Sequence, residues 1–190
     1  MNILKPQKVK LNESEKIDFK NIDRDEDIEH CKFSNIRRQN SKIENTTFRD
    51  VVFENCDFSN TKFIDNTFIR CEFNNCKLSG CDMTENRLYN VTFIETNASY
   101  INLAMASIEN VLFKDSNLRN SYFQETTVKN IYFENADLTQ AQFFKTSLKN
   151  VDLSNSIIEG IAITIDDIKG TIIDQSQSID LLYLLGVKVK

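Results

Sequence analysis

The sequence predicts an all-β solenoid in which a square coil of 20 residues repeats along one axis. Two observations predict this fold class. An apolar residue stands at nearly every fifth position from Phe33 to Ile163, and two positions after most of these apolar residues stands a residue typical of turns. A period of five fits neither the 3.6-residue period of a helix nor the two-residue period of a strand. It fits a backbone that turns a corner every five residues and points the central side chain inward on each side.

The repeat continues without a slip from Cys31 to Ile165, a stretch of 27 pentapeptides. Of the 27 central residues, 25 are Phe, Leu, Ile, Met or Val, and the exceptions are Arg38 and Ala98. Twelve of the 14 Phe have this phase, whereas Phe19 and Phe144 do not. Four sides of five residues close one coil, so the repeat predicts six to seven coils, stacked at about 4.8 Å like ordinary paired strands.

Two further columns of the repeat support the square coil. Small or β-branched residues stand two positions before many centres and fit the inner corner beside a large neighbour: Cys31, Ser41, Thr46, Val51, Cys56, Thr61, Ala106, Ser116, Ala136, Ala141 and Val151. Two positions after the centres, 18 of the 26 residues from Asn35 to Gly160 are Asn, Asp or Gly. These residues tolerate a positive φ and bond to local backbone, as a turn requires.

The two ends of the chain depart from the repeat. We expect residues 1–30 to form an N-terminal segment, in which 17–21 is one irregular repeat, because Phe19 lies 14 residues before Phe33 instead of 15. The acidic stretch 23–29 is expected to hold this irregularity as a loop. Residues 31–174 then form the β-helix, since Ile168 and Ile173 keep the phase.

Residues 175–190 are predicted to form a short helix and a strand. Ser178 can cap the N-terminus of the helix and Gly186 can end it, while Val187–Lys190 can add a strand. An apolar cluster marks this segment: Leu181, Leu182, Leu184 and Leu185. A solenoid exposes its last coil, which must be capped or paired. The leucines therefore either cap the coil within one chain or form a dimer contact.

The pentapeptide pattern resembles that of the pentapeptide repeat proteins, whose consensus is A(D/N)LXX with Leu or Phe at the centre. The resemblance implies a right-handed quadrilateral β-helix. The tail DQSQSIDLLYLLGVKV (174–189) and the stretch KIENTTFRDVVFENCDFS (42–59) further resemble the Qnr/Mfp quinolone-resistance group. In that group two rods pair tip to tip through the C-terminal helix and strand. The resemblance thus implies a homodimer that mimics DNA and binds DNA gyrase, and often topoisomerase IV.

Charge is unevenly distributed over the predicted faces. The face of Phe53, Phe73 and Phe93 carries two lysines, Lys32 and Lys114, against seven acids: Glu54, Glu72, Glu95, Asp115, Glu134, Asp152 and Asp174. The face of Phe48 and Phe68 carries six basic residues, Arg49, Arg70, Arg87, Lys129, Lys149 and Lys169, against Asp50, Glu109 and Asp167. An acid per coil is sparse beside duplex DNA, which has one charge per about 1.7 Å of axis. The acidic side is either a partner-binding face, with Glu54 to Asp152 as its contacts, or a solvated face.

The sequence predicts no catalytic, cofactor or metal site, and we expect a protein that is not an enzyme. All five cysteines (Cys31, Cys56, Cys71, Cys76 and Cys81) stand in the small inward column, so packing accounts for them, and a zinc site would need four converging ligands. Cys56 and Cys76 lie one coil apart, within disulfide range, but free thiols are expected in a reducing cytoplasm. His30, the only histidine, has no nucleophile on a nearby turn.

Several apolar residues are expected to point outward, either as ladders across coils or as a partner surface: Ile64, Ile69, Tyr89, Ile94, Tyr100, Leu112, Tyr122, Tyr132 and Phe144. The chain has 190 residues and 41% hydrophobic content, which suits one domain with a real core. We find no apolar run of membrane-spanning length and no signal-peptide pattern, so a cytoplasmic protein without membrane contact is expected. A net charge of −5 argues against direct binding to nucleic acid.

The sequence therefore leads to two functional hypotheses. The first is a dimeric DNA mimic that binds DNA gyrase, with topoisomerase IV as a second target, and modulates its activity or its quinolone sensitivity. No insertion interrupts Cys31 to Ile165, whereas some Qnr members carry loops linked to the rescue of gyrase from quinolones. The resemblance thus favours gyrase binding over drug protection. The alternative is a capped structural or interaction module for another protein partner.

Overall fold

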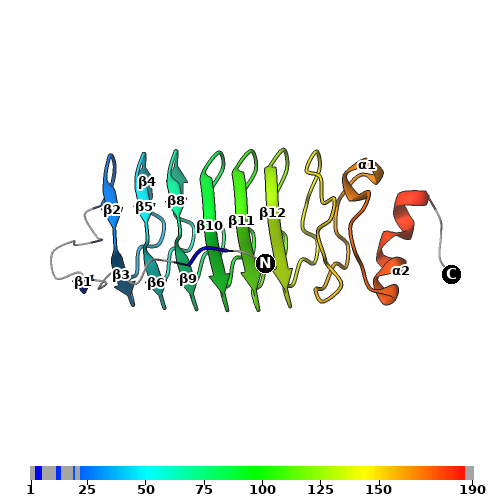
Figure 1. The fold of residues 1–190 in the computed structure, drawn as a ribbon, viewed down its shortest axis with the longest axis horizontal. Coiled ribbons are helices and arrows are strands. Elements are labelled where there is room, and N and C mark those ends of the chain that lie inside the picture. Colours follow the sequence, from blue (N-terminus) through cyan, green and yellow to red (C-terminus); the bar gives the residue numbers. More distant parts are fainter. Residues whose placement is uncertain (1–2, 6–11, 14–18, 20–21, 187–190) are drawn as a thin grey trace.

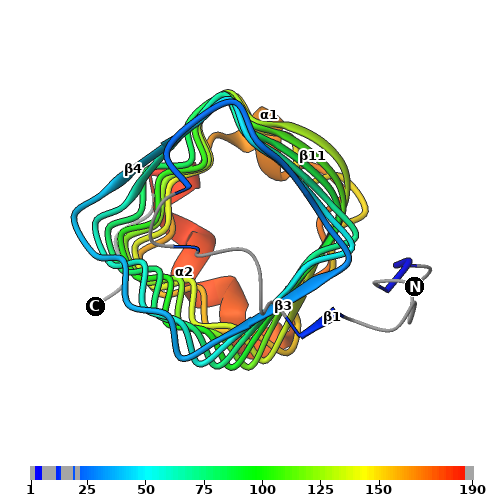
Figure 2. The ribbon, with the colours of Figure 1, turned by 90° about the vertical axis from the view of Figure 1, so that its left-hand side faces the viewer.

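The computed structural model describes residues 3–5, 12–13, 19 and 22–186. Residues 24–172 form a four-sided parallel β-helix (Figures 1 and 2). The strands are β1 (Asn12–Glu13), β2 (Asp27–Glu29), β3 (Cys31–Ser34), β4 (Lys42–Glu44), β5 (Thr47–Arg49), β6 (Val52–Glu54), β7 (Lys62–Ile64), β8 (Thr67–Ile69), β9 (Glu72–Asn74), β10 (Arg87–Ile94), β11 (Ser107–Lys114) and β12 (Thr127–Glu134). The helical segments are α1 (Ile165–Ile168), η2 (Gln175–Gln177), α2 (Ser178–Leu181) and η3 (Leu182–Leu185). None of the described helices is long and apolar enough to cross a membrane.

The 20-residue coil predicted from the repeat is confirmed by the register of the strands. Every parallel pairing from Arg24 to Ile172 joins residues 20 apart; Phe73, for example, lies opposite Phe93, and Phe93 opposite Phe113. The constant register means that no residue is inserted between these two ends. Figure 2 shows the coils in projection, one behind another along the axis of the rod.

The bore of the rod is filled by the central residues of the pentapeptides. All twelve Phe of the predicted phase are buried, and rings one coil apart stack, with centroids 4.7 Å apart for Phe53 and Phe73 and 4.6 Å for Phe93 and Phe113. Such contacts add to the stabilisation from the buried apolar area itself. The small inward column is buried as predicted, except that Ser41 is half-buried. Several of its hydroxyls bond to backbone carbonyls: that of Thr126, for example, donates to Leu103 O at 2.8 Å.

The corners adopt the left-handed conformation that the sequence predicts. From Asp25 to Asn150, every fifth residue has a positive φ, including Arg70, Tyr100 and Met105, which are not typical turn residues. Asparagines at the corners also bond to one another along the rod, as Asn130 Nδ2 does with Asn110 Oδ1 at 2.9 Å. These ladders fix the corners of successive coils against each other.

The N-terminal end differs from its prediction. The coil begins before Cys31, because β2 pairs with β5 and Arg24 pairs with Glu44, both in the 20-residue register. The acidic stretch therefore contains a strand and a corner at Asp25 instead of a loop. The reason is that Ile28 takes the inward position of the repeat, where it is 2% exposed.

Phe19 is the plug of the N-terminal mouth. The centroid of its ring lies 4.7 to 6.3 Å from the ring centroids of four phenylalanines on three sides of the bore: Phe33, Phe48, Phe53 and Phe58. Arg38, an exception to the apolar column, donates to Phe19 O at 2.5 Å and pairs with Asp23. Phe19 is thus out of phase because its ring seals the bore. Most of the expected repeat 17–21 lies outside the described residues.

The C-terminal end is capped by the helical segments after the last coil (Figure 1). The side-chain amide of Gln177 donates to Leu153 O at 2.8 Å and to Ser156 O at 2.6 Å, and Tyr183 Oη donates to Ile161 O. The helical run starts at Gln175, not at the predicted cap Ser178, because the side chain of Asp174 accepts from Ser176 N. Gly186 ends it with φ of 67° as predicted, and the expected strand Val187–Lys190 lies outside the described residues.

Candidate functional site

The carboxylates predicted to contact a partner lie on one side of the coil, here called the acidic face: Glu54, Glu72, Glu95, Asp115, Glu134 and Asp152. This side contains β3, β6 and β9 and the second halves of β10, β11 and β12. Because each coil contributes 20 residues, each of these acids belongs to a different, successive coil.

The acids of this face are not stacked in one column. Asp152 precedes the buried centre of its repeat, Glu134 follows its centre, and Glu95 and Asp115 stand at the corner. The charges of these four acids therefore run obliquely across the face over four successive coils. The corner pair is held firmly, since the amide of Glu95 donates to Lys114 O at 3.0 Å and that of Asp115 to Glu134 O at 2.8 Å.

Two lysines neutralise part of the acidic face. Lys32 Nζ lies 3.0 Å from Glu54 Oε2, and Lys114 Nζ lies 3.3 Å from Glu134 Oε2. No ion pair joins Glu72, Glu95 or Asp152 to any described residue, although Glu72 accepts a weak bond from the amide of Asn74. Within the described part of the chain, the face thus keeps carboxylates that have no ion pair.

Asp152 stays ionised under acidic conditions better than an ordinary aspartate. Its Oδ1 accepts bonds from the hydroxyl and the amide of Ser154, at 2.6 and 2.9 Å, and these bonds lower the pKa of Asp152. The carboxylate of Asp115 accepts a hydrogen bond of 2.8 Å from the side-chain amide of Asn135, and this bond orients the carboxylate.

The neighbouring basic face is more nearly neutral than the sequence predicts. The β-helix begins earlier in the chain than predicted, so Asp27 and Glu29 also belong to this face. Arg49 forms an ion pair with Glu29 at 2.8 Å. Lys129 pairs with Glu109 at 2.6 Å. The electrical contrast between the two faces therefore comes mainly from the acidic face.

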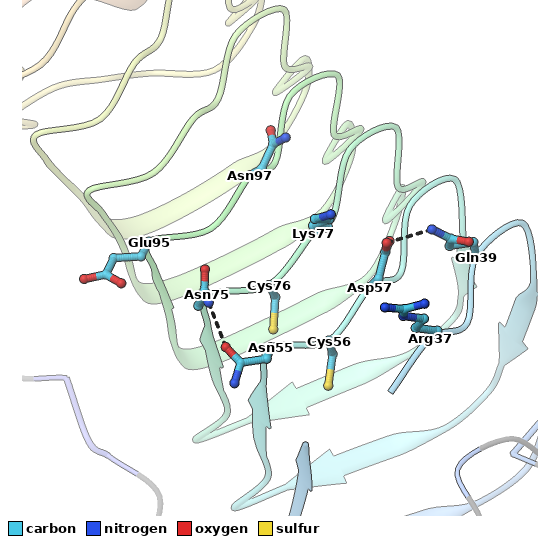
Figure 3. Close-up of a pocket in the computed structure, with 10 residues that line it drawn as sticks. All are labelled: Arg37, Gln39, Asn55, Cys56, Asp57, Asn75, Cys76, Lys77, Glu95 and Asn97. Carbon is cyan, nitrogen blue, oxygen red and sulfur yellow. Dashed lines mark hydrogen bonds between the residues drawn. The ribbon is translucent and has the colours of Figure 1, made fainter. Parts of the chain in front are cut away.

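A polar groove of about 550 Å³ lies beside the corner of the acidic face (Figure 3). Its walls alternate in charge along the rod, with Arg37, Asp57 and Lys77 in neighbouring coils. Asn75 donates to Asn55 at 2.7 Å, and Gln39 to Asp57 at 2.7 Å, so much of the polar lining is already bonded internally. Glu95 is the predicted site residue that lines it.

The C-terminal leucines divide into two groups. Leu181 and Leu184 pack against the core, as an intramolecular cap does, while Leu182 is half-buried. Leu185 points outward with 68% of its surface exposed. Exposed with it are two apolar residues that the sequence analysis did not select, Ile179 at 65% and Tyr183 at 48%.

The cysteines are buried and free, in keeping with a packing role. Burial raises the pKa of Cys71 and of Cys81 to about 12. The thiol of Cys76 donates to the carbonyls of Phe53 and Asn74 at 3.5 and 3.4 Å, and its interaction with the thiol of Cys56 raises the pKa of Cys76 and lowers that of Cys56. In Figure 3 these two residues occupy equivalent positions in successive coils.

Other candidate chemistry stays within the scaffold. His30 Nδ1 lies 3.8 Å from Asp50 Oδ2, and no nucleophilic side chain bonds to it among the described residues. Within the same residues, no cluster of three or more His, Cys, Asp or Glu is arranged to hold a metal ion.

Most residues predicted to point outward are exposed or half-buried, with Tyr100 at 55% and Phe144 at 43%. Leu112 has the outward position as well, but it is only 5% exposed. It lies in register between Thr92 and Tyr132 on the adjacent strands.

Comparison with known families agrees with this architecture. A sequence model of pentapeptide repeats (8 copies) matches residues 46–85, and a model of a pentapeptide repeat region matches residues 66–143. Together they span just over half of the chain. The chain belongs to the pentapeptide repeat proteins. No curated protein sequence matches it.

Solved pentapeptide repeat proteins resemble the chain. Trypsin-treated QnrB1, described as a plasmid-mediated fluoroquinolone resistance protein, is 18% identical, with 84% of this chain and 100% of that chain covered and a TM-score of 0.48. Rfr23 from the cyanobacterium Cyanothece is 17% identical over 78% of this chain and 91% of that one, with a TM-score of 0.30. HetL from the cyanobacterium Nostoc, described as involved in heterocyst differentiation regulation, is 15% identical over 77% and 86%, with a TM-score of 0.26.

Proposed function

We propose that this pentapeptide repeat protein binds DNA gyrase as a DNA mimic and inhibits it, with topoisomerase IV as a second target. The observation that carries the proposal is the oblique run of carboxylates over four successive coils of the acidic face: Glu95, Asp115, Glu134 and Asp152. A surface that binds the phosphates of DNA is basic, and such a run presents fixed negative charges to it.

The β-helix holds these charges in place before binding. Glu95 and Asp115 stand on corners whose backbone amides are hydrogen-bonded to the next coil. Their backbone is therefore already ordered and loses little conformational entropy on binding. Asp152 is oriented by its bonds to Ser154. A rigid acidic surface of this kind suits a preformed basic groove.

Inhibition is the favoured outcome over drug protection. The constant 20-residue register from Arg24 to Ile172 leaves no room for a loop that projects from the coil. Loops of that kind are linked to quinolone protection in the Qnr group, which the tail 174–189 of this chain resembles.

The proposed assembly is a homodimer in which two rods are joined at their C-terminal tips. We place this homodimer and its binding to gyrase in the cytoplasm. The exposed apolar side chains of Ile179, Tyr183 and Leu185 supply the contact. Leu181 and Leu184 support it from beneath as the cap of the coil.

Binding of the purified protein to gyrase, measured by calorimetry, tests the proposal. Reversal of Glu72, Glu95, Asp115 and Glu134 to Lys is expected to abolish binding. The matched control reverses four exposed acids of the other faces, Asp65, Glu85, Glu125 and Glu159, and is expected to bind as the native protein does. Loss of binding in both variants, or in neither, would refute a role for the acidic face.

A second candidate function is an interaction module for another protein, present as a capped monomer. The bonds of Gln177 and Tyr183 to the last coil favour it, because they complete the cap within one chain. Sedimentation velocity separates the two candidates: a dimer at micromolar concentration supports the mimic, and a monomer supports the module.

A further inference from the structure

One stretch of the β-helix lacks the backbone pairing that the rest has. All residues of 127–135 and 147–155 are described, yet no backbone hydrogen bond joins the two segments. One coil earlier the pairing is intact: the amide of Asp115 donates to Glu134 O at 2.8 Å and that of Thr127 to Ala106 O at 3.0 Å. We call this unpaired stretch between the two segments the seam.

The coil after the seam shows which groups the seam leaves open. There the amides of Leu148, Asn150 and Leu153 donate to Asp167, Gly170 and Ile172, at 2.9, 2.9 and 2.8 Å. The equivalent amides 20 residues earlier belong to Val128, Asn130 and Phe133, and they find no carbonyl in 147–155.

The asparagine ladders stop at the same place. Asn130 donates to Asn110 and Asn135 to Asp115, but neither Asn150 nor Asn155 continues these ladders. Side-chain bonds close the coil at both ends of the seam. Thr126 N donates to Thr146 Oγ1 at 3.0 Å, and Ala136 N donates to Ser156 Oγ at 3.2 Å.

A change in the shape of the coil accounts for the seam. The corners Asn130 and Asn150 both have a positive φ, 66° and 65°, and match each other. The next corners differ: Asn135 has φ of 52°, whereas Asn155 lacks the positive φ found at every corner from Asp25 to Asn150. Corners of different conformation displace the donors of one backbone from the acceptors of the next along a parallel ladder.

The seam opens to a groove of about 560 Å³ with a distinct chemical lining. Apolar side chains of Ile131, Tyr132 and Phe133 line part of it, and the remaining residues are polar: Lys114, Asp115, Glu134, Asn135, Asn150, Asp152 and Asn155. Of its four charged residues three are carboxylates, and the one cation is already paired with Glu134 at 3.3 Å.

We propose that the seam docks an extended, basic segment of a partner polypeptide. The segment pairs by its backbone with the free edge of β12 at Phe133 and Asn135, as a strand adds to an exposed sheet edge. Its cationic side chains meet Asp115, Glu134 and Asp152 on the outer side, while its alternate apolar side chains face inward beside Ile131 and Phe133. This docking requires backbone pairing as well as charge, so it does not depend on gyrase binding.

Amide hydrogen exchange tests the free edge itself. The amides of Val128, Asn130 and Phe133 are expected to exchange at least about ten times faster than those of Leu148, Asn150 and Leu153, because only the latter are paired to the next coil. Equal protection of the two sets would mean that the seam is closed in solution and would overturn the proposal.

A labelled probe peptide, Lys-Val-Lys-Val-Lys-Val-Lys, tests the occupant. Its matched control has the same sequence with alternate backbone amides N-methylated, which preserves charge and removes the donors of one edge. We expect the probe to bind and to slow exchange at Phe133 and Asn135, and N-methylation to weaken binding about tenfold or more. Equal binding of both peptides would show attraction by charge alone, and no binding would show no site; either outcome overturns the proposal.

Point variants locate the bound peptide. Asp152→Asn removes a carboxylate of the groove while it keeps the oxygen that accepts from Ser154, and it is expected to weaken the probe several-fold. Glu85→Gln, at an exposed corner of another side, is the control and is expected to leave the affinity unchanged. Equal weakening by both variants would place the peptide elsewhere. Since no arm of the experiment uses gyrase, its outcome is separate from that of the gyrase-binding test.

Discussion

Arg70 holds the buried carboxylate of Asp50, one coil away, through two hydrogen bonds of 2.6 Å. The Asp50 side chain has no exposed surface, whereas Asn90, Asn110 and Asn130 occupy the same column in later coils. An ion pair thus replaces one step of an asparagine ladder, and the charge of Asp50 depends on its partners for compensation.

Replacement of one member of this ion pair is expected to lower the free energy of unfolding more than replacement of both members. Arg70→Leu leaves a buried carboxylate poorly compensated and should lower the free energy of unfolding by about 3–5 kcal/mol. Asp50→Asn combined with Arg70→Asn extends the asparagine ladder and should cost about 1 kcal/mol. Urea denaturation measures both variants, and a double variant as unstable as the single one would contradict this account.

The corner at Met105 should tolerate a better turn residue. Met105 has φ of 57° and is half exposed, and a side chain without local hydrogen bonding is strained there by about 1–2 kcal/mol. Met105→Asn is expected to raise the thermal midpoint, since Asn favours this conformation. Ala104→Asn, one residue earlier and without a positive φ, is the control and should bring no gain.

Two variants at the C-terminal tip should separate capping from dimerisation. Gln177→Leu leaves the carbonyls of Leu153 and Ser156 without their donor and is expected to lower the free energy of unfolding by about 1–3 kcal/mol. Leu185→Glu changes an exposed side chain and should leave stability unchanged while it disrupts the dimer. Sedimentation and denaturation are measured for both; a monomeric native protein would remove the dimer from the account.

Cys71 and Cys81 should be nearly inert in the folded protein. Burial raises the pKa of Cys71 and Cys81 to about 12, from 9.0, so their thiolate fraction at pH 8 is very small. Alkylation by iodoacetamide should be at least about 100-fold slower for these two in native protein than in guanidinium chloride. Mass spectrometry identifies the sites, and rapid native labelling of Cys71 would argue against the packed bore.

Stability should fall only under distinctly acidic conditions. Bonds from Ser154 lower the pKa of Asp152. At Asp57 partial burial raises the pKa, but bonds from Ser59 and Gln39 and the charge of Lys77 together lower it. A carboxyl whose folded pKa is below its unfolded value of about 3.9 stabilises the fold above that pH and loses this contribution as the pH falls through the folded pKa. Urea midpoints should therefore hold from pH 7 to about 4 and drop below it. Ser154→Ala should reduce the contribution of Asp152.

The sequence was sufficient for the bore and the corners of the rod. Phe53, Phe73 and Phe93 could be placed inward, and Asn110 and Asn130 at corners, because a strict period of five ties each residue type to one position in the coil. The same period located the acids on one face. These features depend only on which residue follows which, and not on how distant segments meet.

The ends and the seam depend on contacts that no period encodes. Phe19 is out of phase since it enters the bore from the open mouth, and Gln177 acts by reaching carbonyls of the preceding coil. The seam arises where two coils of different backbone shape meet, between residues with the same pattern. The split of the leucines, with Leu184 inward and Leu185 outward, follows from the angle at which the helical cap meets the coil.

Supercoiling of relaxed plasmid DNA by gyrase, with the purified protein added and with or without a quinolone, tests the central claim most directly. Full inhibition at low micromolar concentration, lost when Glu72, Glu95, Asp115 and Glu134 are reversed to Lys, is the predicted result. Unchanged supercoiling and unchanged drug-stabilised cleavage at tens of micromolar native protein would contradict the account of this rod as a mimic of DNA.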